Sequence, residues 1–127
     1  MRVLLDTNVL LRALAGDPAV DGMREILLAE ETEVFFSAVS WWDIAARIEA
    51  GLLRADLKEL RAAAVESGFI ELPLRGEHIG GLPSVSDSGL DITSFDRMIA
   101  AQAESEPLRL ISADVRLAGR SALFLRA

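Results

Sequence analysis

Short, strongly apolar segments recur along the chain, each bounded by polar or turn-forming residues. Segments of this length are too short for typical helices. Continuous apolar character is instead typical of strands buried on both faces of a parallel sheet. We therefore predict strands at 2–5, 33–37, 69–72 and 108–111, with a terminal strand at 123–125.

Between these segments, apolar residues recur at helical spacing. Gly16 and Gly51 each follow one of the predicted helices as a stop signal. Ser37 or Ser40 can cap the start of a third, and Ser94 can cap a fourth. The predicted helices span 8–15, 20–31, 39–50, 54–66, 75–82 and 95–104, with a helical turn at 113–117.

The order of these elements predicts the fold class. Strands that alternate with helices indicate an α/β protein with helices on both faces of its sheet. We expect a three-layer α/β/α arrangement around a central, mostly parallel sheet of four to five strands, formed by one domain over 1–127. Residues 83–90 are predicted to be a loop, and a loop of this length inside a domain is usually functional.

The amino-acid composition limits the kinds of site and the cellular location that we expect. Half of the residues are hydrophobic (51%) and Cys is absent, which excludes disulfides and thiolate metal sites. The apolar N-terminal run stops at Asp6, too early for a signal peptide, so we expect a cytoplasmic protein with no membrane segment. The net charge of −7 argues against binding nucleic acid by bulk electrostatics, so any such role must depend on a local site.

Four acids lie at the carboxyl ends of predicted strands or at the helix starts beside them. This is the edge at which parallel sheets bind their ligands. The four acids are Asp6, Asp43, Asp96 and Asp114. Taken singly, Asp43 and Asp96 could simply charge a helix start, and Asp114 could be a turn residue. Taken together, four converging carboxylates would repel one another unless cations lay between them. Oxygen ligands of this kind suit Mg²⁺ or Mn²⁺.

Other catalytic arrangements are missing from the sequence. His78 is the sole histidine and is predicted to lie on a helix surface, and without Cys no nucleophile–histidine pair is indicated. No phosphate-binding glycine loop occurs. Metal-assisted hydrolysis of a phosphodiester is therefore the favoured chemistry.

Four ordered motifs also resemble those of a known family. Around the four acids the chain reads LLDTNVLL (4–11), SAVSWWDIA (37–45), FDRMIAAQA (95–103) and LISAD (110–114). These segments resemble PIN domains of the VapC toxin type, over essentially the whole chain.

The resemblance implies an endoribonuclease that uses Mg²⁺ or Mn²⁺ to cut structured RNA such as tRNA or rRNA. It implies that Asp6, Asp43, Asp96 and Asp114 bind the metal. Polar neighbours would orient these acids, and they are Thr7, Asn8 and Ser112. It also implies a homodimer, inhibited by a VapB-like antitoxin whose C-terminal segment lies along the site.

Two departures from the family pattern stand out. The second acid is usually Glu in this family, and Asp43 is one methylene shorter. Relatives often have an acid at the position of Thr93, and Asp87 or Asp91 is a candidate substitute.

Several other residues have open interpretations. Arg97 and Arg116 follow the third and fourth acids and are candidate contacts for RNA phosphate, or else surface charges. Trp41 and Trp42 cannot face the same way on a helix, so we expect one in the core and one at a partner surface.

Two rival functions remain open at this point. One is a PIN-like module that binds RNA or protein without cutting. The other is a phosphatase with Asp6 as the nucleophile, although such enzymes typically have an acid at the position of Asn8.

Overall fold

A computed structural model describes residues 1–17, 23–117 and 124–127. Its described residues form one five-stranded sheet in the order β3-β2-β1-β4-β5, with every neighbouring pair parallel. The strands are β1 (Arg2–Leu5), β2 (Glu33–Ser37), β3 (Ile70–Leu72), β4 (Arg109–Ser112) and β5 (Phe124–Arg126). The predicted parallel sheet is thus confirmed, and all its carboxyl ends share one edge.

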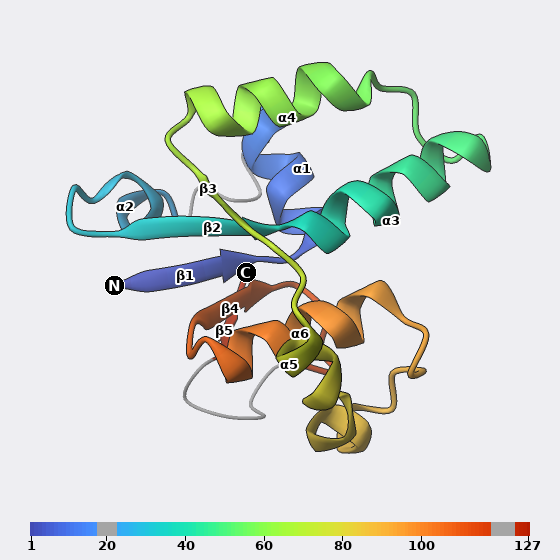
Figure 1. Cartoon of the computed structure of the whole chain (residues 1–127). Helices are drawn as coiled ribbons and strands as arrows, with labels where there is room; N and C mark the ends of the chain where they lie inside the picture. The colour runs from blue at the N-terminus through green and yellow to red at the C-terminus, as the bar shows by residue number, and fades with distance from the viewer. Residues whose placement is uncertain (18–22, 118–123) are drawn as a thin grey trace.

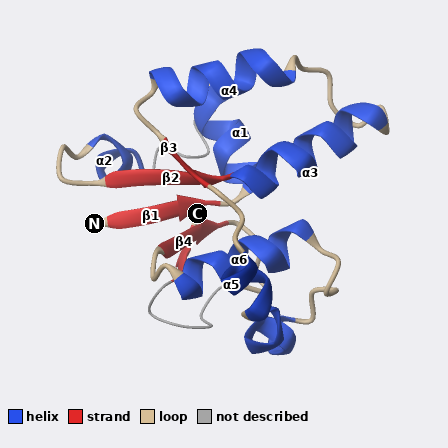
Figure 2. Cartoon of the chain, viewed as in Figure 1, coloured by secondary structure: helices blue, strands red, loops and turns tan. Residues whose placement is uncertain are grey.

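Helices lie on both sides of this sheet. They are α1 (Thr7–Ala15), α2 (Arg24–Leu28), α3 (Ala38–Glu49), α4 (Leu57–Glu66), α5 (Gly76–Gly80) and α6 (Phe95–Ser105), with a 3₁₀ helix, η2, at Leu82–Ser88. Figure 1 shows α1, α3 and α4 together on one side of the strands and α5 and α6 on the other. Figure 2 shows the helices outside and the strands between them, which is the predicted three-layer α/β/α architecture. None of the described helices is long and apolar enough to cross a membrane.

Alternation along the strands builds two apolar cores. Successive side chains of a strand point to opposite faces. In β1, Leu4 belongs to the core under α6, whereas Val3 and Leu5 belong to the core under α1 and α3. In β2, Phe35 and Phe36 divide in the same way. Burial on both faces explains why these strands read as continuous apolar runs.

Local capping places three helix starts at the carboxyl edge. Asp6 accepts a hydrogen bond from the backbone N–H of Val9 and so caps α1, directly after β1. Ser37, one of the two predicted candidates, ends β2 and caps α3, and Ser94 caps α6 as predicted. Each cap satisfies backbone donors that the first helical turn leaves free. The same geometry brings the acid-bearing segments of α1, α3 and α6 to one edge of the sheet.

Two predicted segments differ from the structure. The helix predicted at 20–31 is observed only as α2, and its residues 20–22 lie outside the described residues, as does residue 123 of the predicted terminal strand. The predicted loop 83–90 is largely the 3₁₀ helix η2. Val85 and Leu90 are buried against α6, so this tract is an ordered part of the core.

Candidate metal centre

Asp6 is the acid at the centre of the carboxyl edge. Its backbone N–H continues the sheet by donating to the carbonyl of Ile111 at 3.1 Å, and its side chain is 3% exposed. Burial raises the pKa of Asp6, and the nearby charge of Asp114 adds to this rise. Hydrogen bonds from Ser112 and from the Val9 backbone oppose it. Asp6 is therefore a fixed carboxylate in a poorly solvated place.

Asp96 faces the other three acids from the first turn of α6. The pKa of Asp96 is raised to about 6, mainly by burial and further by the charges of Asp6, Asp43 and Asp114. The residues that act on Asp96 show that the four predicted acids do converge. Its Oδ1 is buried and has no hydrogen-bond partner among the described residues. A buried acceptor without a partner is costly unless something else, such as a cation, fills the place.

Asp43 lies on the inner side of α3 and is 5% exposed. Both of its oxygens are bound by Arg47 one turn further along the helix, with Nε–Oδ1 at 2.9 Å and Nη2–Oδ2 at 3.1 Å. The remaining arm of Arg47 donates to Asn8 Oδ1 on α1 at 2.8 Å. Arg47 is a residue that sequence reasoning missed, although its spacing of four from Asp43 on a predicted helix is the signal for such a pair.

Asp114 follows β4 and is held by Arg116, whose Nη2 donates to Oδ2 at 2.7 Å. This guanidinium is the main cause that lowers the pKa of Asp114. Ser112 accepts from the Asp114 backbone N–H at 3.0 Å and also bonds the Asp6 carboxylate. Ser112 therefore joins the first and fourth acids, in a position that fits its predicted orienting role.

The charges of the site do not balance. Arg47 and Arg116 each neutralise one acid by a direct ion pair. Among the described residues, Asp6 and Asp96 form no ion pair. Two poorly solvated carboxylates without an ion pair, one of which has an oxygen with no hydrogen-bond partner in the described part of the chain, fit a hard divalent cation. Mg²⁺ or Mn²⁺ suits this all-oxygen donor set better than a soft metal does.

The other predicted neighbours have different partners. Thr7 is fully buried and donates to Ser40 Oγ at 3.1 Å, so it ties α1 to α3 and does not bond Asp6 through its hydroxyl. Asn8 accepts from Arg47, and through it supports Asp43.

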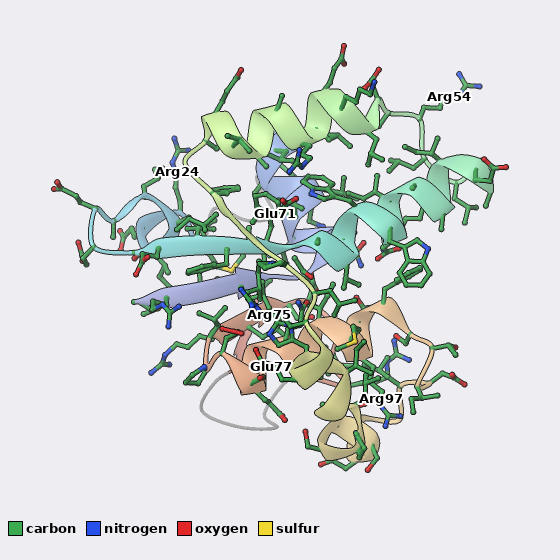
Figure 3. The ribbon with its side chains drawn as sticks, in the orientation of Figure 1. Arg24, Arg54, Glu71, Arg75, Glu77 and Arg97 are labelled. Atoms are coloured by element: carbon green, nitrogen blue, oxygen red, sulfur yellow. The ribbon has the colours of Figure 1, made fainter. Side chains whose placement is uncertain are left out.

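Arg97 does not occupy the position expected of a phosphate contact. Its side chain is buried and donates to the backbone carbonyls of Leu82, at 2.8 and 3.1 Å, and of Leu90, at 3.1 Å. Figure 3 shows Arg97 turned toward the η2 region. Arginine is usually exposed, which is why the sequence suggested a surface role. Arg116 is more than half exposed in its ion pair with Asp114, and its predicted RNA contact stays a prediction.

The prediction that His78 lies on a helix surface is wrong. The ring is fully buried between α5 and α6, where Nδ1 accepts from the backbone N–H of Arg75 at 3.0 Å. The tautomer is thereby set, and Nε2–H donates to Glu106 at 2.6 Å. Gln102 completes this buried network by bonding Ser37, the carbonyl of Pro73, and His78. The network fastens α6 to the start of α3, and it involves residues far apart in the sequence.

His78, Glu77 and Glu106 bring three ligand atoms within 4.8 Å of one another, the one such group of His, Asp or Glu side chains among the described residues. The four aspartates are therefore not drawn together as tightly. A metal on Nε2 would require the proton on Nδ1, where Arg75 already donates. Figure 3 labels Arg75 and Glu77 at the start of α5. We interpret this group as a structural hydrogen-bond cluster.

The tryptophans divide as predicted between core and surface. Trp41 is buried beside Phe36 and donates to Glu71 at 2.7 Å, whereas Trp42 is 66% exposed and contacts Phe95 edge to face.

Asp91, one of the two loop acids proposed to replace the missing acid at Thr93, bonds within its own turn. Asp91 accepts from the backbone N–H and the hydroxyl of Thr93, closing the turn before α6. The acids whose charge raises the pKa of Asp96 are Asp6, Asp43 and Asp114, and include neither Asp91 nor Asp87.

A comparison of the sequence with protein-family models shows to which family the chain belongs. The sequence matches the PIN domain family over residues 3–122. The chain belongs to the PIN-domain family. No match was found among curated proteins.

Solved structures share this PIN fold at low sequence identity. A chain of VapBC2 from Rickettsia felis, bound to a DNA fragment from its promoter, has a TM-score of 0.68 and 17% identity, covering 100% of this chain and 98% of that one. A chain of a toxin–antitoxin complex from Klebsiella pneumoniae has a TM-score of 0.67 and 19% identity, with coverages of 97% and 95%. A chain of FitAcB from Neisseria gonorrhoeae has a TM-score of 0.53 and 24% identity, with coverages of 88% and 87%.

Proposed function

We propose that this PIN-domain protein is a Mg²⁺- or Mn²⁺-dependent endoribonuclease that acts as a VapC-type toxin in the cytoplasm. The observation that carries the proposal is the state of two acids whose charges interact, Asp6 and Asp96. Both are shielded from water, neither has an ion-pair partner among the described residues, and Asp96 Oδ1 has no hydrogen-bond partner. Membership of a family whose members are typically metal-dependent nucleases supports the same function.

In the proposed mechanism Asp6 and Asp96 would hold the metal ion, with Asp43 and Asp114 as further candidate ligands. The bound ion would lower the pKa of a water, orient it toward the phosphorus and neutralise charge on the phosphate. Val9 and Ser112 fix the Asp6 carboxylate by hydrogen bonds, so it needs little reordering when the cation arrives. Arg116 is more than half exposed, which supports a role in which it leaves Asp114 and binds a phosphate oxygen.

The overall charge of −7 affects how RNA is held. A protein of this charge gains little from general attraction to phosphates. The metal centre must therefore supply much of the binding, and a structured RNA such as tRNA or rRNA fits because its shape adds contacts that do not depend on net charge.

We further propose that the protein forms a homodimer and is inhibited by a VapB-like antitoxin. Relatives that share its fold were crystallised as VapBC and toxin–antitoxin complexes, which supports a protein inhibitor for this chain. The 66% exposure of Trp42, beside Asp43 on α3, is consistent with a partner at this edge.

The test is cleavage of total cellular RNA by purified, antitoxin-free protein with Mg²⁺, with Mn²⁺ and with a chelator. We expect discrete products that require metal and vanish in Asp6→Asn. The matched control is Asp56→Asn, the same chemical change at the exposed cap of α4, where Asn also caps well, and it should cleave like wild type. Absence of cleavage by folded protein with either metal would refute the nuclease and favour a PIN module that binds without cutting.

A further inference from the structure

Arg47 binds both carboxylate oxygens of Asp43, one of the predicted metal ligands. The guanidinium takes both oxygens of Asp43 in a parallel, two-pronged contact at 2.9 and 3.1 Å. Such fork-to-carboxylate pairs are among the stronger hydrogen-bonded ion pairs. The side chains are 28% and 8% exposed, so water screens this pair less than it screens a surface pair.

The position of Arg47 is itself fixed from a second helix. Its Nη1 donates to Asn8 Oδ1 on α1 at 2.8 Å, so the guanidinium bridges α1 and α3 beside the acids. Its charge also acts on Asp96, where it opposes the effect of the three neighbouring carboxylates. Arg47 is thus a resident cation at the edge of the metal centre, held by three hydrogen bonds.

A metal ion and Arg47 cannot share Asp43 favourably. Mg²⁺ binds carboxylate oxygens at about 2.0–2.1 Å and requires strict octahedral geometry. A metal bound to Asp43 would lie next to the guanidinium of Arg47. The two positive charges would repel each other, because the guanidinium cannot lose its proton. The short Asp43 side chain keeps its carboxylate close to its own helix, within reach of the residue one turn along.

We propose that Arg47 is an internal competitor for the metal. In the metal-free protein it binds both carboxylate oxygens of Asp43, and it must leave before Asp43 can ligate a cation. This inference rests on the proposed metal-dependent function and adds a form of regulation to it. The metal-free protein keeps its acids partly neutralised by its own arginine, and the metal affinity is lowered by the ion pair that loading must break. Asn8 stabilises the closed arrangement.

The experiment is a titration of each purified protein with Mn²⁺ alone, followed by calorimetry and by the electron paramagnetic resonance signal of free Mn²⁺. The variants are Arg47→Gln, which removes the charge and the contact, and Arg47→Lys, which keeps the charge without the two-pronged contact. The control is Arg12→Gln, because Arg12 is exposed and acts on Asp6 only through its charge at a distance. Thermal unfolding in chelator checks that each variant folds.

We expect Arg47→Gln to bind Mn²⁺ about tenfold more tightly than wild type, a change equivalent to about 1.4 kcal/mol of lost competition. Arg47→Lys should lie between the two, and Arg12→Gln should change the affinity less than about twofold, since an exposed distant charge is screened. Binding by Arg47→Gln where wild type binds none would support the proposal more strongly still.

Equal affinities for wild type and Arg47→Gln would overturn the proposal and leave the nuclease standing, because Arg47 would then remain on Asp43 while the metal binds elsewhere. An equal gain in Arg12→Gln would also overturn it, since the effect would be one of general charge. No Mn²⁺ binding by any folded protein in the series would overturn both this proposal and the proposed function.

Discussion

The folded protein should become more stable, in the absence of metal, when Asp96 is changed to Asn. The folded state disfavours the Asp96 carboxylate because it is partly buried and faces three other acids. Replacing the carboxylate by a neutral amide of the same shape removes that repulsion. It also places N–H donors where Oδ1 has no hydrogen-bond partner within the described ranges, near carboxylates that can accept.

The size of this effect follows from the pKa of Asp96, which rises from 3.8 to about 6. At 1.36 kcal/mol for each pKa unit, the folded state disfavours the ionised form by about 3 kcal/mol at neutral pH. Asp96 is not fully buried, so solvent screening reduces this to about 1–2 kcal/mol. Loss of an acid from the first turn of α6 takes back about 0.3–1 kcal/mol of helix-dipole stabilisation. The net gain is about 1 kcal/mol, or about 3–6 °C in the melting temperature.

The assay is urea and thermal unfolding in chelator at several pH values. An acid whose folded-state pKa is raised holds its proton more tightly when folded. Its destabilising effect is therefore absent below pH 3.8, grows between pH 3.8 and about 6, and is full above that. The gain from Asp96→Asn should therefore be full at pH 7.5 and shrink toward pH 4. The control is Glu59→Gln, an exposed first-turn acid of α4 outside the cluster, which should lose up to about 0.5 kcal/mol. A less stable Asp96→Asn at pH 7.5 would show that the four acids do not repel one another as described.

Three further predictions concern residues around the site. Gln102→Leu should lower the free energy of unfolding by about 2–4 kcal/mol, since it leaves buried partners in the α3–α6 network unbonded; a loss within about 0.5 kcal/mol in urea titrations would contradict that role. Arg97→Met should speed proteolysis within 82–90, because η2 and Leu90 lose their hydrogen bonds to the guanidinium. Mass spectrometry of the fragments checks this, and the same cleavage rate and pattern as wild type would contradict it. Trp41→Phe should cost about 1–3 kcal/mol through its bond to Glu71 and its packing, while Trp42→Phe should stay within about 0.5 kcal/mol; similar losses in the two would argue against the division into core and surface.

Much of the fold could be predicted because local signals agree with the tertiary structure. β2 has the predicted bounds, and the start of α6 follows from Ser94 as its cap. The four acids were predicted to converge because parallel strands end at one edge, and the charges acting on Asp96 bear this out. Family membership is confirmed independently by the match over residues 3–122.

The remaining features depend on contacts between distant residues. His78 looked like a surface residue because nothing near it in the sequence shows that Gln102 and Glu106 meet it across α5 and α6. The tract 83–90 looked like a loop from its Ser, Pro and Gly content, yet Val85 anchors it in the core. Arg97 buries its charge by meeting carbonyls of that tract, a contact that no spacing rule indicates.

The central claim is that Asp6 and Asp96 hold a divalent cation, and anomalous diffraction from crystals soaked in Mn²⁺ tests it most directly. We predict one strong anomalous peak in contact with carboxylate oxygens of both Asp6 and Asp96, absent from crystals of Asp6→Asn. A map with no peak at these acids at saturating Mn²⁺, or with its peak at Glu77, His78 and Glu106 instead, would contradict the account.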